Sequence, residues 1–267
     1  MSAVTFLRRA GHGLLDLVFP PRCLVCHQSG APLCDDCCRG FRRVPSPICH
    51  LCGTPTSDPG LCRRCQHTPL DIDGIRSVVL FEHGVRQAVH QFKYRDCRSL
   101  AVPLAGVMAD YWRAHPMPFD LIAPVPLHPA RQRERGYNQA DLLARAFGRM
   151  IGIPVGVAGL KRLRHTRPQM SLNAADRREN VHNAFACVTS RGEVPTKSST
   201  EKDCDDLGVN GRRVLVVDDV CTTGSTLEAC SIALKAAGAI SVWGFTLARA
   251  THQPSLHLVQ GNSEQKG

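Results

Sequence analysis

The 267-residue sequence has few aromatic residues and no long apolar segment: 5% of its residues are aromatic, although 43% are hydrophobic. A membrane-spanning helix is not expected, because it needs roughly eighteen or more consecutive apolar residues. The apolar stretch after Arg8 and Arg9 is interrupted by His12, Asp16 and Pro20, which argues against a signal peptide. We therefore expect a cytoplasmic chain with no membrane span, made of one main domain and a smaller module.

Negative charge is scarce relative to positive charge. The chain has 33 Lys and Arg against 23 Asp and Glu, a formal net charge of +10. Much of this excess lies within residues 131–178. It favours an anionic partner such as a phosphate or a nucleic acid, without defining a site.

Cysteine, in contrast, is abundant, with 14 residues. In a reducing compartment cysteines are more often metal ligands or free thiols than disulfides. Four Cys-x-x-Cys pairs lie within residues 23–65, and each pair can present two sulfurs to one ion. The eight candidate ligands are Cys23, Cys26, Cys34, Cys37, Cys49, Cys52, Cys62 and Cys65.

We interpret these pairs as two sequential tetrathiolate sites that hold about two Zn²⁺ ions. An interleaved cross-brace is the other possible pairing, since the spacing does not decide between them. Redox-active or simply buried thiols are the alternative to metal binding. Because all the ligands are cysteines and no coordination position is left open, the expected role is structural.

The rest of the chain alternates strand-like and helix-like segments, which predicts an α/β fold with a mainly parallel sheet flanked by helices. The expected strands are residues 77–81, 121–125, 213–217 and 241–247. The expected helices are residues 100–114, 137–151 and 225–237.

These patterns also divide the chain. The predicted parts are an N-terminal segment (1–22), a cysteine-rich double zinc-binding module (23–70), a main domain (71–250) and a tail (251–267). Residues 189–211 are polar and without periodicity, so we expect a surface insertion or a disordered loop there.

Residues 214–226 contain the most specific motif. An apolar strand leads into Asp218 and Asp219, then into a loop of hydroxyl groups and glycine, then into a helix. Ligands bind at the carboxyl ends of parallel strands, and a helix N-terminus favours a phosphate. For the carboxylates, the alternatives are a ribose diol, a metal ion or a solvated turn. Residues 225–228 also fit a capping box, which would only start the helix.

Residues 216–226 resemble the signature with which type I phosphoribosyltransferases bind phosphoribosyl pyrophosphate (PRPP). The resemblance implies that the two carboxylates hold the ribose hydroxyls, that the loop holds the 5-phosphate, and that Mg²⁺ accompanies PRPP. The implied PRPP-binding residues are Asp218, Asp219, Val220, Cys221, Thr222, Thr223, Gly224, Ser225 and Thr226.

Further motifs resemble the ComF/GntX family of competence-associated proteins. They are the cysteine pairs, Phe92-Lys93-Tyr94, Pro124-Val125-Pro126-Leu127 with the following Arg131 to Gln139, and the stretch from Arg164 to Phe185. The resemblance covers about residues 19–249 and implies a type I phosphoribosyltransferase domain behind a double zinc ribbon. The insertion at 189–211 is its main departure from the family pattern.

Four further side chains are candidates for the pyrophosphate and for the loop that covers it: Lys93, Arg131, Arg135 and Gln169. The forked donors of arginine suit a pyrophosphate, although a solvated basic loop is the alternative for residues 126–135. Residues 164–169 resemble the mobile loop that closes over PRPP in this fold.

Two functions of different classes remain open. The first is a phosphoribosyltransferase of unknown acceptor, acting in natural competence, DNA uptake and transformation. It needs no protein nucleophile, because pyrophosphate leaves and an external base attacks. The second is a non-catalytic, PRPP-responsive protein that binds single-stranded DNA and contacts DNA-uptake proteins. A glutamine amidotransferase is not expected, because residue 2 is Ser. A purely structural zinc protein would leave the acidic pair and the loop unexplained.

Overall fold

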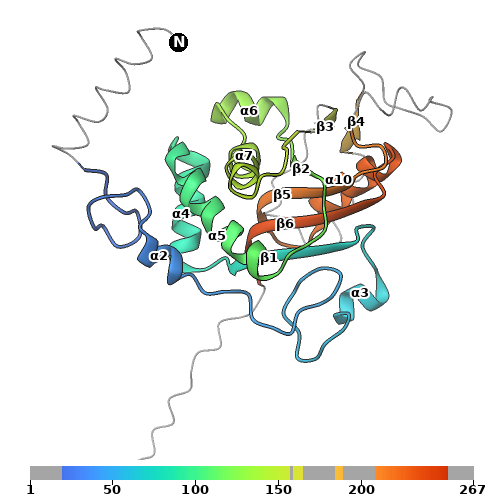
Figure 1. The fold of residues 1–267 in the computed structure, drawn as a ribbon, viewed down its shortest axis with the longest axis horizontal. Helices are drawn as coiled ribbons and strands as arrows, with labels where there is room; N and C mark the ends of the chain where they lie inside the picture. Colours follow the sequence, from blue (N-terminus) through green and yellow to red (C-terminus); the bar gives the residue numbers. More distant parts are fainter. Residues whose placement is uncertain (1–19, 157–158, 165–183, 189–207, 252–267) are drawn as a thin grey trace, which may run out of the picture.

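A four-stranded parallel sheet forms the centre of the protein (Figure 1). The computed structural model describes residues 20–156, 159–164, 184–188 and 208–251. The strand order is β1-β6-β5-β2, and all three neighbouring pairs are parallel. The strands are β1 (Gly74–Leu80), β2 (Leu121–Pro124), β5 (Arg213–Cys221) and β6 (Ser241–Arg249). The predicted α/β fold with a parallel sheet is confirmed.

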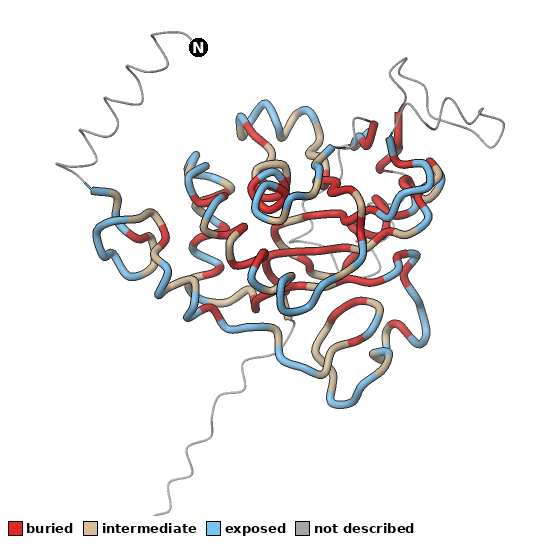
Figure 2. Tube along the Cα trace, viewed as in Figure 1, coloured by how far each residue is buried: buried red, intermediate tan, exposed pale blue. Residues whose placement is uncertain are grey.

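Helices cover both faces of this sheet and enclose two hydrophobic cores. The first face carries α4 (His83–Tyr94), α5 (Ala101–Ala114) and α7 (Gln139–Ile151). The second face carries α10 (Ser225–Ala236). Alternate residues of a strand point to opposite faces, so Leu215 and Val217 enter the first core and Val214 and Val216 the second. Figure 2 shows the buried strands between these layers.

Five short elements complete the described fold. β3 (Leu160–Arg162) and β4 (Phe185–Cys187) form an antiparallel pair that packs on α10. The other three are α2 (Asp35–Arg39), α3 (Arg63–His67) and α6 (Pro129–Arg135), besides a 3₁₀ turn at Arg98–Leu100. Among the residues that the structure describes, a helix with the length and apolar composition of a membrane span is absent.

Several predicted bounds were wrong by a few residues. β1 begins at Gly74, three residues earlier than expected. α7 begins at Gln139, two residues later than expected, because Asn138 is its N-cap and its side chain accepts a hydrogen bond from the Ala140 N–H at 3.0 Å. α10 ends at Ala236, one residue early.

The basic segment before α7 is a helix and not a loop, but none of its residues is buried, so its contact with a pyrophosphate stays a prediction. Pro129 occupies the first turn of α6, and Gly136 ends the helix with a φ of 75°. α4 was not predicted at all. Its buried Val85, Ala88 and Phe92 follow the helical period, but polar residues separate them.

The two cysteine clusters pack against different cores. Cys23 belongs to the core beneath α4 and α5, whereas Cys49, Cys52 and Cys65 belong to the core beneath α10. Between the clusters, the chain runs antiparallel along β1, where the Leu80 N–H donates to the Arg42 carbonyl at 2.8 Å. The module therefore reaches both faces of the sheet.

The predicted domain boundary at residue 70 stays a prediction. Most of the N-terminal segment 1–22, of the insertion 189–211 and of the tail 251–267 lies outside the described residues.

A glycine of the second cluster lies unusually close to β1. Gly53 has a φ of 67°, and a Cβ built there would lie 2.3 Å from the Ile75 carbonyl oxygen. Gly152 has a similar φ of 74° with open space around it. The Gly152→Ala variant should lose about 1–2 kcal/mol of unfolding free energy through backbone strain alone. Gly53→Ala should lose more, because the backbone must also move. Urea unfolding measures both, and equal losses would contradict this close packing.

Candidate functional site

Both candidate carboxylates lie within β5 and not after it. The strand was expected to end at residue 217, but it pairs with β6 as far as Cys221, which lies opposite Arg249. Asp218 lies opposite Thr246 in the same register. Val220 and Cys221, which the resemblance assigned to PRPP binding, are therefore strand residues, and the Cys221 side chain is buried. The reason is β6, whose length offers β5 a partner beyond the apolar run.

The two carboxylates lie among basic side chains of the layers that cover the sheet. Asp219 forms an ion pair with Lys93 of α4, with 2.8 Å between Lys93 Nζ and Asp219 Oδ2. Asp218 lies near enough to Lys93 and Arg162 for both positive charges to lower its pKa. The Asp219 N–H also donates to Asp218 Oδ1 at 2.8 Å. The site thus combines an acidic pair with basic side chains from both layers.

The environment changes the pKa of the Asp218 carboxyl strongly. Burial, together with the negative charge of Asp219, raises the pKa of the Asp218 carboxyl to about 7. The positive charges of Lys93 and Arg162 act in the opposite direction. The acidic pair can therefore hold a proton at a pH where most carboxyls are ionised.

The phosphate loop, defined here as residues 222–226, leads from β5 into α10. Its Gly224 is the N-cap of α10 and has a φ of 86°. Thr223 Oγ1 and Ser225 Oγ lie 2.9 Å apart and share a hydrogen bond. The capping box suggested by the sequence does not form, because the N-cap is Gly224, which has no side chain, and Glu228 Oε1 accepts from the Asp71 N–H at 3.1 Å. The Ser225 N–H instead donates to Thr223 Oγ1 at 3.4 Å. The first N–H groups of a 12-residue helix thus lie beside the carboxyl end of β5.

The last turn of α4 carries Lys93 and is contacted by Arg135. Arg135 donates to the Tyr94 hydroxyl at 3.2 Å and to Gln139 Oε1 at 3.1 Å. Its guanidinium also lies 4.9 Å from the centre of the Tyr94 ring. Tyr94 directly follows Lys93, whose side chain forms the ion pair with Asp219.

The other two candidates, Arg131 and Gln169, differ from this pair. Burial lowers the pKa of the Arg162 guanidinium most, and the positive charge of Arg131 lowers it further. Arg131 therefore lies near Arg162. Gln169 and most of the segment expected to cover PRPP lie outside the described residues.

Sequence reasoning missed three arginines at the site: Arg64, Arg162 and Arg249. The Arg64 side chain donates to the Thr223 carbonyl at 2.5 Å. Arg249 is buried and donates to the Cys52 carbonyl at 2.8 Å and to Cys221 Sγ at 2.9 Å, and it also contacts Thr54 Oγ1. The sequence carries no sign of these contacts, because their partners are distant along the chain.

The eight predicted cysteine ligands gather into the two sequential groups. Within each group, all four sulfurs lie within 4.8 Å of one another. Cys23 and Cys37 are 3.7 Å apart, and Cys52 and Cys62 are 3.6 Å apart. A tetrahedron with Zn–S distances of about 2.3 Å has edges of about 3.8 Å, so both sulfur sets fit a structural zinc ion. The interleaved pairing is not formed.

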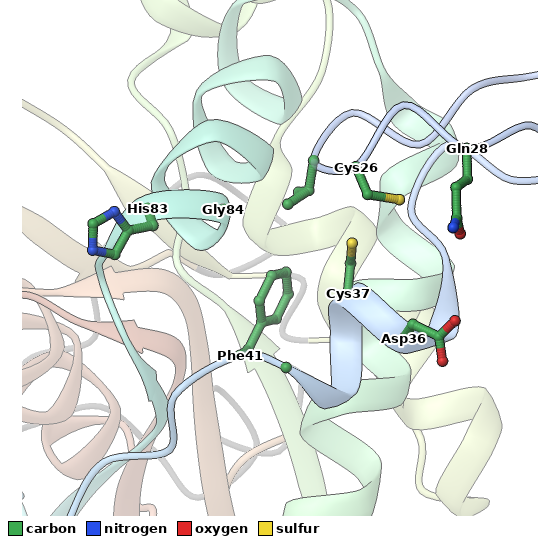
Figure 3. Close-up of a pocket in the computed structure, with 9 residues that line it drawn as sticks. Cys26, Gln28, Asp36, Cys37, Phe41, His83 and Gly84 are labelled. Carbon is green, nitrogen blue, oxygen red and sulfur yellow. The ribbon is translucent and has the colours of Figure 1, made fainter.

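A separate cavity of about 440 Å³ lies beside the first cluster. Cys26, Cys37, Phe41 and His83 are among its lining residues (Figure 3). The lining contains none of the candidate PRPP residues and includes two sulfurs of the first cluster. We therefore attribute part of this space to the metal position.

Two known protein families match parts of this chain. Residues 14–66 match the double zinc ribbon domain, and residues 156–257 match the phosphoribosyl transferase domain. The chain is 34% identical to competence protein F of Haemophilus influenzae, over 86% of this chain and 97% of that protein. It is 32% identical to the DNA utilization protein YhgH of Salmonella typhi, over 87% and 99% of the two chains.

Among solved structures, the glutamine PRPP amidotransferase from B. subtilis overlaps with 58% of this chain and 30% of its own chain. The sequence identity is 18% and the TM-score is 0.35, and values this low do not indicate a shared function.

The sulfur geometry predicts that protein purified without chelator holds about two Zn²⁺ per chain. Cys23→Ser and Cys62→Ser should each lose one ion and lower stability and solubility, because a small module depends on its metal to fold. Elemental analysis measures the ions, and thermal unfolding measures the stability. Wild-type protein without zinc would contradict the assignment.

Proposed function

Since the chain belongs to the ComF family, that of competence protein F, we propose that it binds PRPP with Mg²⁺ and acts in natural competence, in DNA uptake and transformation. The observation that carries the proposal is the junction of β5 and α10, where an acidic pair precedes a left-handed Gly224 at a helix N-terminus. The diol and the 5-phosphate of PRPP belong to one ribose and lie close together. The acidic pair and the helix N-terminus that would bind them must therefore lie side by side. The names of the relatives support the role in DNA use.

Different residues of the chain bind different parts of PRPP. Asp218 and Asp219 accept hydrogen bonds from the ribose hydroxyls, and the N–H groups of the phosphate loop hold the 5-phosphate. Lys93, released from Asp219, turns to the pyrophosphate with Arg131 and Arg135, where their positive charges stabilise the leaving group. Mg²⁺, when bound, neutralises part of the pyrophosphate charge. Gln169 is proposed to lie in the covering loop.

Catalysis requires an acceptor, which these groups do not identify. The chain would position PRPP and stabilise the departing pyrophosphate, while the acceptor supplies the attacking atom. Pyrophosphate release from PRPP, measured across nucleobases and single-stranded DNA as acceptors, separates an enzyme from a non-catalytic PRPP-responsive protein.

A single-stranded DNA-binding role is the second candidate, and the end of α4 favours it. Tyr94 is 54% exposed, and the His90 ring lies 5.0 Å from it. An exposed ring beside Arg135 offers a surface on which a nucleobase can stack, next to the basic helix α6. This surface adjoins Lys93, so DNA and PRPP would bind near one another. We propose a cytoplasmic site of action with DNA-uptake proteins as partners.

Removing either carboxylate should weaken PRPP binding. Asp218→Asn and Asp219→Asn each lose a charge-assisted hydrogen bond, which contributes roughly 1.5 to 3 kcal/mol, or about ten- to more than a hundredfold in affinity. Calorimetry with PRPP and Mg²⁺ measures the loss. The control is Asp110→Asn, an exposed carboxylate on α5 that should leave binding unchanged. A double Asp218→Asn, Asp219→Asn variant that binds like wild type would overturn the proposal.

PRPP affinity should rise with pH. The raised pKa of Asp218 means that the ligand-free carboxyl carries a proton below about pH 7. Ribose hydroxyls and Mg²⁺ favour the ionised carboxylate, so binding must release that proton. Affinity should therefore increase as the pH approaches the pKa and level off above it. Asp218→Asn, measured in parallel, corrects for titration of the ligand phosphates. A pH profile identical to that of Asp218→Asn would contradict this assignment.

Binding to single-stranded DNA should fall steeply with salt, because bound Lys and Arg displace condensed counterions. Tyr94→Ala should weaken it by about 1–3 kcal/mol through lost stacking, whereas Tyr94→Phe keeps the ring and should bind nearly as wild type. Fluorescence anisotropy of a labelled oligonucleotide at several salt concentrations measures both effects. Flat salt dependence, or no binding at low salt, would remove this candidate.

A further inference from the structure

One side chain of the second cysteine cluster reaches into the phosphate loop. Arg64 lies in α3 directly before Cys65, and its Nη2 donates to the Thr223 carbonyl oxygen at 2.5 Å. Arg64 is half-buried, whereas the adjacent Arg63 is exposed. The contact joins a metal-ligating segment to residues 159 positions later in the chain.

This hydrogen bond orients the peptide that joins Thr223 to Gly224. In a planar trans peptide, the carbonyl and the following N–H point in opposite directions. With the Thr223 carbonyl held toward Arg64, the Gly224 N–H must point away from the cysteine cluster. A glycine accepts positive and negative φ about equally, so this peptide could otherwise turn over at little cost.

The second cluster is itself fixed to the end of the sheet. Buried Arg249 links the Cys52 carbonyl to Cys221 Sγ, and the Ile75 N–H donates to the Leu51 carbonyl at 2.7 Å. The cluster therefore shares one core with Cys221 and Leu227, which flank the phosphate loop, whereas the first cluster packs with α4 and α5 on the opposite face.

The conformation of Arg64 depends on the ligands beside it. α3 has five residues, and a helix of that length has little stability of its own. Its Cys65 and the preceding Cys62 belong to one sulfur group. An ion held by these thiolates fixes the backbone on both sides of Arg64.

We propose that Arg64 is a positioning residue for the phosphate loop, so that metal occupancy of the second cluster, and not of the first, sets the affinity for the 5-phosphate. The inference rests on the proposed function for its ligand and on the contact of Arg64 with Thr223 for its mechanism. The zinc module thereby controls ligand binding in the main domain.

The decisive comparison is Arg64→Ala against Arg63→Ala in the full-length protein. Calorimetry should show Arg64→Ala binding PRPP with Mg²⁺, and also ribose 5-phosphate, roughly tenfold more weakly than wild type, a change of about 1.4 kcal/mol. Magnesium pyrophosphate, which lacks the 5-phosphate, should bind equally well. Arg63→Ala should match wild type throughout, and both variants should keep the wild-type zinc content, since all eight cysteines remain.

A second measurement needs no ligand. Hydrogen exchange at the amides of residues 223–226 should be faster in Arg64→Ala and in Cys62→Ser than in wild type, and unchanged in Arg63→Ala and in Cys26→Ser. If Cys62→Ser does not fold, Arg64→Ala decides alone. Wild-type exchange rates in Arg64→Ala, or equal weakening for magnesium pyrophosphate, would overturn the positioning role. A wild-type protein that does not bind PRPP would instead overturn the proposed function, and the exchange rates would still decide whether Arg64 orders the loop.

Discussion

The pairing of β5 with β6 as far as Cys221 and Arg249 is the constraint on which the rest of the site depends. It carries β5 beyond its apolar run and so holds Asp218 and Asp219 in extended backbone, just before the phosphate loop. It also determines where the strand ends and where Gly224 turns the chain into α10. Arg249, at the end of the same pairing, then contacts the second cysteine cluster.

The sheet separates two cores, and this division gives the two cysteine clusters different surroundings. The first cluster supports the layer of α4, whose last turn supplies Lys93 to Asp219. The second cluster shares the core beneath α10 and contacts the phosphate loop through Arg64. Direct contacts, and not only chain connectivity, thus join the N-terminal module to the phosphate loop of the main domain.

Sequence reasoning recovered the features that short-range patterns encode. The Cys-x-x-Cys spacing predicted both sulfur groups, and the apolar runs predicted the parallel sheet. The predicted end of β5 was wrong. Aspartate rarely occurs in strands, so the prediction stopped at residue 217, but pairing with the long strand β6 overrides that preference here. α4 was missed because polar residues separate its buried side chains. The contacts of Arg64 and Arg249 span more than a hundred residues, and a single sequence carries no signal for such pairs.

The most direct test of this account is a crystal structure of the protein with PRPP and Mg²⁺. The account predicts the 5-phosphate within hydrogen-bond distance of the backbone N–H groups of the phosphate loop, including that of Gly224. It also predicts the ribose hydroxyls on Asp218 and Asp219, with Lys93 moved from Asp219 to the pyrophosphate. PRPP bound elsewhere, with the ion pair between Lys93 and Asp219 intact, would contradict it.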